Sequence, residues 1–233
     1  MQKRHVINAA VAAAATAALV AVPAALAASS TPATVTVRIE GQTKTLLAAT
    51  TVKTAAGSIT RGGAPAGKCP STTAQGALQD ATRGKWTGSW TKSYDEYYVT
   101  AILGDTEATA KAYWAIYVNG KYATTGACET ALKSGDSVLF AVVPGKGKTP
   151  LALGVTLPAK GVDGHQVTAK VVYYDAKGKK HPLVGASVTL GGVTVTTKAG
   201  GVTAPIKLTG KGSETLKVSK SGCVRTEATI SVS

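Results

Sequence analysis

Turns that contain glycine divide the last third of this 233-residue chain into short apolar stretches. From residue 165 onward such turns recur about every ten residues, and no helical spacing of apolar residues lies between them. The pair Gly191-Gly192 joins two of these stretches as a two-residue hairpin turn. Regular short strands without helices are typical of two packed sheets. We therefore expect residues 151–233 to form an all-β sandwich.

The region before it follows a different order of elements. Residues 34–40 alternate polar and apolar side chains, as a half-buried strand does. Apolar residues at helical spacing follow between residues 74 and 81, and further strand patterns come after them. Among these later strands, the pair Asn119-Gly120 is a strong hairpin signal. Strands, then one helix, then strands again predict an α+β domain with one helix over residues 34–143.

A stretch rich in glycine, proline and lysine at residues 144–150 separates two regions of different composition and predicts a linker. Ten of the twelve Trp, Tyr and Phe residues lie before it, from Trp86 to Phe140. Residues 147–233 are more basic, with twelve Lys and Arg against four Asp and Glu. Two domains, at 34–143 and 151–233, fit this shift better than one domain does.

The first 27 residues have the layout of a secretory signal peptide. A positively charged start precedes an apolar, alanine-rich run, and small residues at 25–27 fit a cleavage site. A transmembrane anchor is the weaker reading, because the run is short and Pro23 interrupts it. We expect a leader at 28–33 and then a secreted, extracellular protein without a transmembrane segment. Association with the cell surface is left open.

The formal charge of +14 does not by itself indicate nucleic acid. Nucleic-acid binders combine a dense basic patch with stacking aromatic rings. Here the aromatic residues lie in the less basic region, and the lysines are dispersed except at residues 177–180. A dispersed positive surface suits loose attraction to anionic polymers such as those of a cell wall. One hypothesis is therefore a structural spacer or wall-adhesive protein that contacts anionic polymer through a lysine-rich sandwich.

The residue inventory argues against an enzyme. Nucleophilic catalysis needs a base that a third group holds in place, yet His165 and His181, both in the second region, are the only histidines after residue 27. Asp95 and Glu96 are adjacent, so on a strand their side chains point to opposite faces and cannot flank one bond. No HExxH, GxSxG or phosphate-binding loop occurs. We expect no enzymatic activity, no cofactor and no metal.

Three cysteines in an exported chain imply one disulfide and one remaining thiol. Cys69 and Cys128 lie in the same predicted domain, and closing the loop of about 60 residues between them stabilises a fold by roughly 4 kcal/mol in the chain-entropy model. Metal or redox chemistry is the weaker reading, because no CxxC motif and no neighbouring histidine occurs. We predict a structural Cys69–Cys128 disulfide. Cys223 is then a buried small hydrophobe or an intermolecular link.

Several motifs within residues 34–143 resemble the transcobalamin C-terminal-like family, a secreted module of mostly unknown function. They include Trp86-x-Gly88-x-Trp90, Tyr113-Trp114-x-x-Tyr117-Val118-Asn119-Gly120 and Gly135-Asp136-x-Val138-Leu139-Phe140. That family folds as a β-grasp-like domain with strands wrapped on one helix. The resemblance implies this fold for residues 34–143 and a small, corrinoid-like ligand.

The second region carries a separate resemblance. Residues 165–233 resemble the Ig-like or carboxypeptidase-regulatory-like accessory modules of secreted bacterial proteins, through Pro182-Leu183-Val184-Gly185-Ala186-x-Val188 and Lys220-x-Gly222-x-Val224-Arg225. This resemblance implies an Ig-like form of the expected sandwich.

The tyrosines and tryptophans of the first region form the best candidate for a ligand site. Strand alternation places Tyr113 and Tyr117 on one face and Trp114 on the other, among aliphatic residues. We therefore expect Trp114 in the core and a tyrosine-lined face that stacks on a flat or sugar-like small ligand. One alternative is aromatic packing across strands without a ligand. If the strand is instead buried on both faces, the site is expected in the loops around residues 62–68 and 124–126. The residues predicted to bind ligand are Tyr113, Tyr117, Tyr98, Trp90 and Tyr122.

Overall fold

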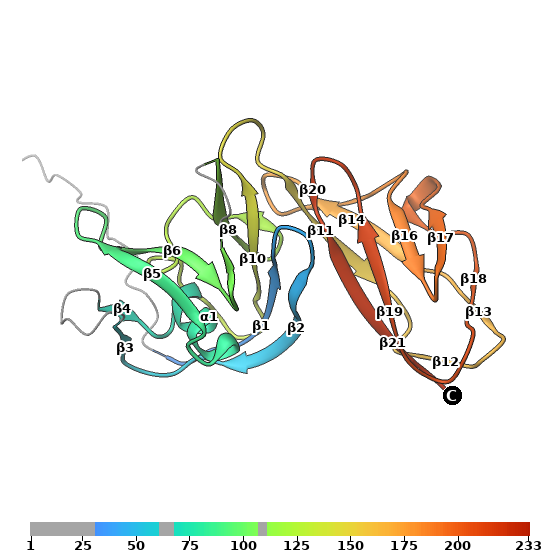
Figure 1. Cartoon of the computed structure of the whole chain (residues 1–233), viewed down its shortest axis with the longest axis horizontal. Helices are drawn as coiled ribbons and strands as arrows, with labels where there is room; N and C mark the ends of the chain where they lie inside the picture. Colours follow the sequence, from blue (N-terminus) through green and yellow to red (C-terminus); the bar gives the residue numbers. More distant parts are fainter. Residues whose placement is uncertain (1–30, 61–67, 107–110) are drawn as a thin grey trace, which may run out of the picture.

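The structure, a computed structural model, describes residues 31–60, 68–106 and 111–233. Strands make up most of its regular structure, and they form two halves that lie side by side (Figure 1). The predicted signal peptide, the start of the leader and nearly all of the loop at 62–68 lie outside the described residues.

Five strands form the main sheet of the first half: β1 (Thr34–Glu40), β2 (Thr45–Lys53), β8 (Ala112–Val118), β9 (Lys121–Tyr122) and β10 (Ser137–Pro144). Their order across the sheet is β2-β1-β10-β8-β9. β1 and β10 are parallel, and the other neighbours are antiparallel. Asn119 and Gly120 connect β8 to β9 with φ angles of 52° and 78°, which confirms the predicted hairpin.

One helix and two small sheets complete the first half. The helix, α1 (Ala74–Thr82), ends at Arg83 and Gly84, both in the left-handed conformation. Its buried residues Ala77 and Leu78 belong to the same core as Ile39 of the main sheet. The small sheets consist of β3 (Ser58–Ile59) with β4 (Cys69–Pro70), and of β5 (Trp86–Thr91), β6 (Glu96–Ile102) and β7 (Asp105–Thr106).

Two further sheets form the second half. The first contains β11 (Leu151–Thr156), β14 (Lys170–Tyr174), β15 (Lys180–Pro182) and β20 (Cys223–Val224). The second contains β12 (Lys160–Gly161), β16 (Ser187–Leu190), β17 (Val193–Thr196), β19 (Gly212–Ser219) and β21 (Thr226–Val232). Three short elements complete this half. β13 (Gln166–Val167) pairs with β18 (Ile206–Lys207), and a 3-10 turn, η1 (Ala199–Gly201), follows β17.

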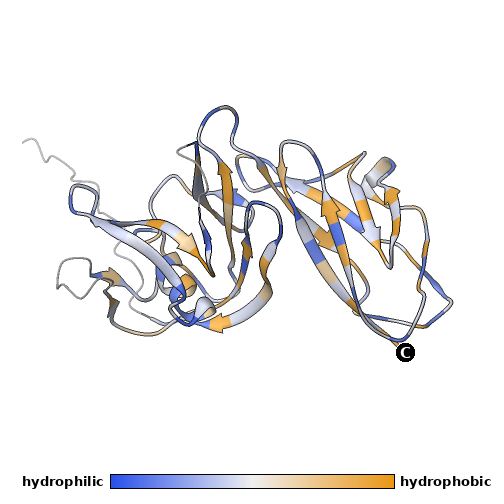
Figure 2. Ribbon diagram, in the orientation of Figure 1, coloured by the Kyte–Doolittle hydropathy of each residue, from blue (hydrophilic) through white to orange (hydrophobic). Residues whose placement is uncertain are grey.

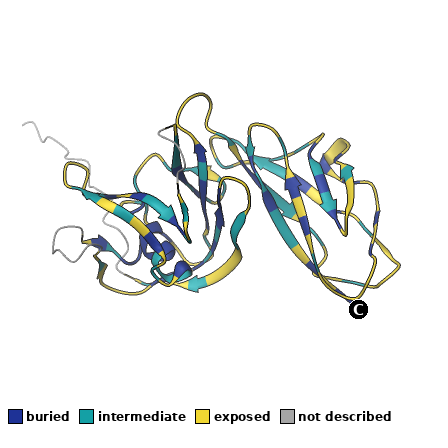
Figure 3. Ribbon diagram, in the orientation of Figure 1, coloured by how far each residue is buried: buried dark blue, intermediate teal, exposed yellow. Residues whose placement is uncertain are grey.

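Aliphatic side chains from both of these sheets share one core. Leu153 and Val171 come from the first sheet, and Leu190, Leu216 and Ile230 come from the second. Along β19 the buried residues alternate with exposed ones, and hydrophobic residues alternate with polar ones (Figures 2 and 3). The second half is thus built as a β-sandwich, in line with the regular spacing of its turns.

The α+β, β-grasp-like class expected for residues 34–143 is wrong, because the first half is mostly strand. Its only helix in the described chain, α1, has nine residues. Helical spacing of apolar residues occurs once, and the left-handed Arg83 and Gly84 stop it early. The alternation typical of half-buried strands continues through the rest of the region. The helix is therefore an addition to a β structure and does not define its class.

Both faces of strand β8 are buried. Trp114 faces the core that includes α1. Tyr117, on the opposite face, packs in a separate cluster that includes Ala152 and Val224 from the second half. The Tyr117 side chain is only 2% exposed, and its hydroxyl donates a hydrogen bond to the Pro150 carbonyl at 2.7 Å. The tyrosine face that alternation left open to solvent is therefore covered by the sandwich.

A buried ion-pair cluster adds a polar contact between the halves. Glu40 of β1 is 1% exposed, and its Oε2 accepts a hydrogen bond from Arg225 Nε at 2.9 Å. Arg225 also donates to the Gly41 carbonyl, and Arg38 donates to the Thr226 hydroxyl across the same junction. Burial raises the pKa of Glu40, while Arg38 and Arg225 act in the opposite direction. The two halves thus meet through apolar packing and through an ion-pair cluster of one carboxylate and two guanidinium groups.

Truncation of Trp114 or of Tyr117 in β8 should destabilise the protein. We expect Trp114→Ala and Tyr117→Ala each to lower the free energy of unfolding by about 3–5 kcal/mol, since each removes a buried ring. Urea unfolding followed by circular dichroism measures both values. Tyr94→Ala is the control, because this side chain is 74% exposed and its removal should change little. A tolerated Tyr117→Ala would contradict the packing of the second half on this face.

Arg225→Ala should loosen the contact between the halves. It leaves the Glu40 carboxylate buried with one guanidinium partner fewer, which should lower the free energy of unfolding by about 3 kcal/mol. We also expect faster proteolysis between β10 and β11, within residues 145–150. Arg83→Ala is the matched control, because this arginine is exposed and takes no part in the ion pairs of the described residues. Equal cleavage rates in the two variants would argue against the ion-pair cluster.

Candidate functional site

The five aromatic residues predicted to bind ligand lie in three environments in the structure, although the Tyr117 and Tyr122 rings pack edge-on with centroids 5.6 Å apart. Tyr98, Tyr113 and Tyr122 line one cavity. Tyr117 is buried at the junction of the halves. Trp90 packs edge-on against Tyr97, with ring centroids 4.9 Å apart, and borders the core of the first half. The structure thus brings three of the five together, and the ligand role of these residues stays a prediction.

The cavity has a volume of about 290 Å³ and lies between β6, β8 and residues 122–127. β9 pairs only with Tyr117 and Val118, so no other described strand covers the rest of the outer edge of β8. The hydroxyl oxygens of Tyr113 and Tyr122 are 3.2 Å apart. This hydrogen bond, followed by burial, raises the pKa of Tyr122 to about 12. The Tyr122 phenol therefore stays a neutral donor and acceptor at the cavity wall over the physiological pH range.

Trp114 contributes a hydrogen-bond donor without a partner. Its side chain is 8% exposed and lines the cavity. The indole Nε1 is buried, and no acceptor lies within hydrogen-bond distance of it among the described residues. An unsatisfied buried donor costs about 1–3 kcal/mol. The first half therefore keeps an unused N–H group in the wall of this cavity.

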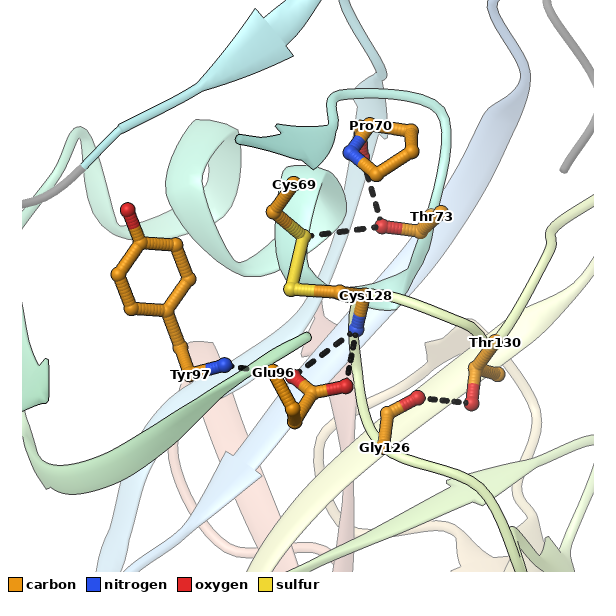
Figure 4. The surroundings of a disulfide bond; sticks show 8 residues. All are labelled: Cys69, Pro70, Thr73, Glu96, Tyr97, Gly126, Cys128 and Thr130. Atoms are coloured by element: carbon orange, nitrogen blue, oxygen red, sulfur yellow. Dashed lines mark hydrogen bonds between the residues drawn. A yellow bond between two sulfur atoms is a disulfide. The ribbon is translucent and has the colours of Figure 1, made fainter. Parts of the chain in front are cut away.

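The loop that follows the cavity wall is held by a disulfide. Cys128 is bonded to Cys69 of β4, which confirms the predicted pair. Figure 4 shows that this bond connects the loop to the chain just before α1. Cys223, the remaining cysteine, is a free and partly exposed thiol, and burial raises its pKa.

The Glu96 carboxylate anchors the same loop from the other side. Its two oxygens accept hydrogen bonds from the backbone N–H of Cys128, at 3.1 and 2.9 Å, and Tyr97 N–H donates to Oε1 at 3.0 Å (Figure 4). A Cβ atom at Gly126 would lie 1.9 Å from Glu96 Oε2, so this close approach requires glycine. The loop and strand β6 are thus fixed against each other beside the cavity.

The pKa of Glu96 is raised to about 7. Burial is the largest cause, and the charge of Glu129 acts in the same direction, while the backbone N–H groups of Cys128 and Tyr97 lower the pKa. No cationic side chain balances this carboxyl group in an ion pair among residues 31–60, 68–106 and 111–233. Glu96 therefore changes charge near neutral pH at the cavity.

Sequence reasoning considered Glu96 only as a partner of Asp95 in catalysis. Strand alternation contained the missing signal, because it places Glu96 on the same face of β6 as Tyr98 and opposite the buried Tyr97 and Val99. Residues 124–126, which belong to the loop alternative, line this cavity and a second one of about 330 Å³, and Thr124 and Thr125 also line a third of about 720 Å³.

Three further observations concern the described part of the chain outside the cavity. Its His, Cys, Asp and Glu side chains form no group of three or more that could hold a metal ion. None of its helices has the length and apolarity needed to span a membrane. His181 is hydrogen-bonded to Asp175 at 2.8 Å in the second half, far in sequence from the cavity residues.

The raised pKa of Glu96 predicts a pH dependence of stability. A carboxyl group with a higher pKa in the folded chain than in the unfolded chain binds more protons when folded, so its contribution falls as pH rises from about 4.5 to about 7. We expect this decline in the melting temperature to be smaller in Glu96→Gln than in the wild type. Glu227→Gln, in strand β21, is the control. Equal declines in Glu96→Gln and the wild type would show that Glu96 titrates normally.

Comparison with known structures gives a distant likeness. A polysaccharide lyase shares 15% sequence identity and a TM-score of 0.28 over 72% of this chain. The chain spans 29% of the length of that protein, and a likeness this weak carries no information on activity. No curated protein matches the sequence.

A family comparison identifies part of the first half. Neither the resemblance to the transcobalamin C-terminal-like family nor the Ig-like resemblance is confirmed by this comparison. Residues 71–143, which include α1, the cavity strands β6 and β8 and the disulfide loop, match the family described as a domain of unknown function (DUF4430).

Proposed function

We propose that this chain is a secreted, non-enzymatic binding protein that holds a small ligand in the 290 Å³ cavity between β6, β8 and residues 122–127. The observation that supports this most is the convergence of Tyr98, Tyr113 and Tyr122 on one cavity. These residues come from three separate segments of the chain. The sandwich then serves as an accessory, Ig-like module that covers the opposite face of the sheet.

The chemistry of the cavity indicates the kind of ligand. Tyrosine rings offer flat apolar surfaces with polar tips, which suits flat or sugar-like molecules. Trp114 Nε1 offers a donor, and the paired hydroxyls of Tyr113 and Tyr122 offer both a donor and an acceptor. A volume of about 290 Å³ is near the lower end for small-molecule sites, so the cavity suits a compact ligand or one part of a larger ligand.

The transcobalamin resemblance adds a corrinoid-like compound to the candidates. Such a macrocycle exceeds what this cavity can enclose, so it would bind with only its rim or a side group inside. Smaller aromatic and sugar-like compounds fit the volume better.

One observation favours a second function, the contact with anionic polymer through the sandwich. Asp175 Oδ1 accepts backbone hydrogen bonds from Lys177 and Lys179, each at 2.9 Å. These bonds order a turn that presents Lys177, Lys179 and Lys180 to solvent. Three neighbouring positive charges suit a polyanion, which binds by charge and without an enclosed site.

A thermal-shift screen separates the two functions. A ligand that binds the folded cavity raises the melting temperature by mass action, and salt affects this rise little. We expect Tyr122→Ala to abolish the rise, because Tyr122 lines the cavity. Tyr173→Ala, a similarly half-buried tyrosine of the sandwich, is the matched control and should retain the rise.

A response confined to polyanions, lost in high salt and unaffected by Tyr122→Ala, would contradict the cavity proposal and favour the polymer contact. The screen should therefore include neutral aromatic compounds, sugars, a corrinoid and a polyanion, each at low and high salt. Each variant needs its own unliganded melt, so that a loss of binding is not confused with a loss of stability.

A further inference from the structure

A second cavity, of about 330 Å³, adjoins the first and has different walls. The two share Glu96, Tyr97, Tyr98 and residues 124–126. The outer cavity adds Tyr94 from the β5–β6 turn and Glu129 from the disulfide loop. It therefore forms an outer extension of the proposed site, on the side away from Tyr113 and Tyr122.

The charges at this outer cavity are opposite to the charge of the whole protein. The sequence carries a formal charge of +14. Glu96 and Glu129 are the only charged side chains that line the cavity, and no Lys or Arg lies among its lining residues. The two carboxyl groups are close enough for the charge of Glu129 to raise the pKa of Glu96. This is a locally negative pocket on a strongly positive protein.

Aromatic faces at the same cavity are unusually exposed. Tyr94 is 74% exposed and Tyr98 is 50% exposed, and they are the only exposed tyrosines in the described part of the chain. Both line the outer cavity. The face of an aromatic ring carries negative charge density and attracts a cation that sits over it, most strongly when the cation loses its water.

We propose that the outer cavity binds the cationic group of an organic ligand, an ammonium or guanidinium group, between Tyr94, Tyr98 and the carboxylates of Glu96 and Glu129. This inference rests on the proposed function, since it assigns a charge to part of the same ligand. The carboxylates attract the positive charge, and the rings cover its apolar substituents. A cation here also supplies the partner that the half-buried Glu96 carboxylate lacks in an ion pair.

The loop geometry suits this role because the carboxylate of Glu96 is already held in place. Its oxygens accept the N–H groups of Cys128 and Tyr97, which fixes the carboxylate at the cavity wall before any ligand arrives. The Cys69–Cys128 disulfide fixes the same loop, from which Glu129 extends into solvent. Groups held in advance lose little conformational freedom on binding.

Two probes of equal shape test the charge requirement: choline and 3,3-dimethylbutan-1-ol, in which carbon replaces the charged nitrogen. Each is titrated into ¹⁵N-labelled full-length protein at constant chloride, and amide shifts are followed by NMR. We expect choline to shift amides within residues 94–98 and 124–129 in a saturable way, with at least about tenfold tighter binding than the alcohol.

Variants confined to the outer cavity show where the cation binds. Glu129→Gln and Tyr94→Leu should each weaken choline binding several-fold, since one removes a charge and the other an aromatic face. Both side chains are exposed, so the fold should persist, and the amide spectrum itself verifies this. Glu227→Gln removes the same charge from the sandwich and should leave choline binding unchanged.

Several outcomes would overturn the inference. They are equal affinity for choline and the alcohol, no saturable shift at these amides with either probe, or choline binding that survives in both variants. Failure here is distinct from failure of the proposed function. The latter is measured with neutral ligands and Tyr122→Ala, which alters the inner cavity and leaves the residues that line the outer cavity unchanged.

Discussion

The burial of Tyr117 between the two halves is the contact on which the rest of the structure depends. Because its ring is enclosed by residues of both halves, the main sheet has a core on each face. The Glu40–Arg225 ion pair lies at the same junction, so the contact between the halves is partly ionic. A ligand is therefore left with the edge of β8 rather than its face, and the cavity lies at that edge.

Much of the local structure could be predicted from the sequence. The Asn119-Gly120 hairpin, the helix near residue 74 and the core position of Trp114 all follow from spacing within one element. The class of the first half did not follow, because a single helical pattern was given the same weight as many strand patterns. The environment of Tyr117 did not follow either, since alternation separates two faces without showing what covers each.

The candidate site was predictable to a similar extent. The Cys69–Cys128 pair followed from an odd number of cysteines and from their position within one region. Tyr98, Tyr113 and Tyr122 followed from composition, but their convergence needs the fold, because β6 belongs to a different sheet from β8 and β9. Glu96 gains its role from backbone N–H groups of a loop distant in sequence, which no local pattern reveals.

The junction also has a consequence for the order in which the chain is completed. Tyr117, Ala141 and Val143 are made well before Val224, which covers the same cluster from near the end of the sequence. Until that last segment arrives, a nascent chain displays an apolar sheet surface with no partner. Such surfaces promote association between incomplete chains. A chain that crosses a membrane in an extended form, and folds only after strands β20 and β21 have emerged, would not expose this surface to another copy of itself.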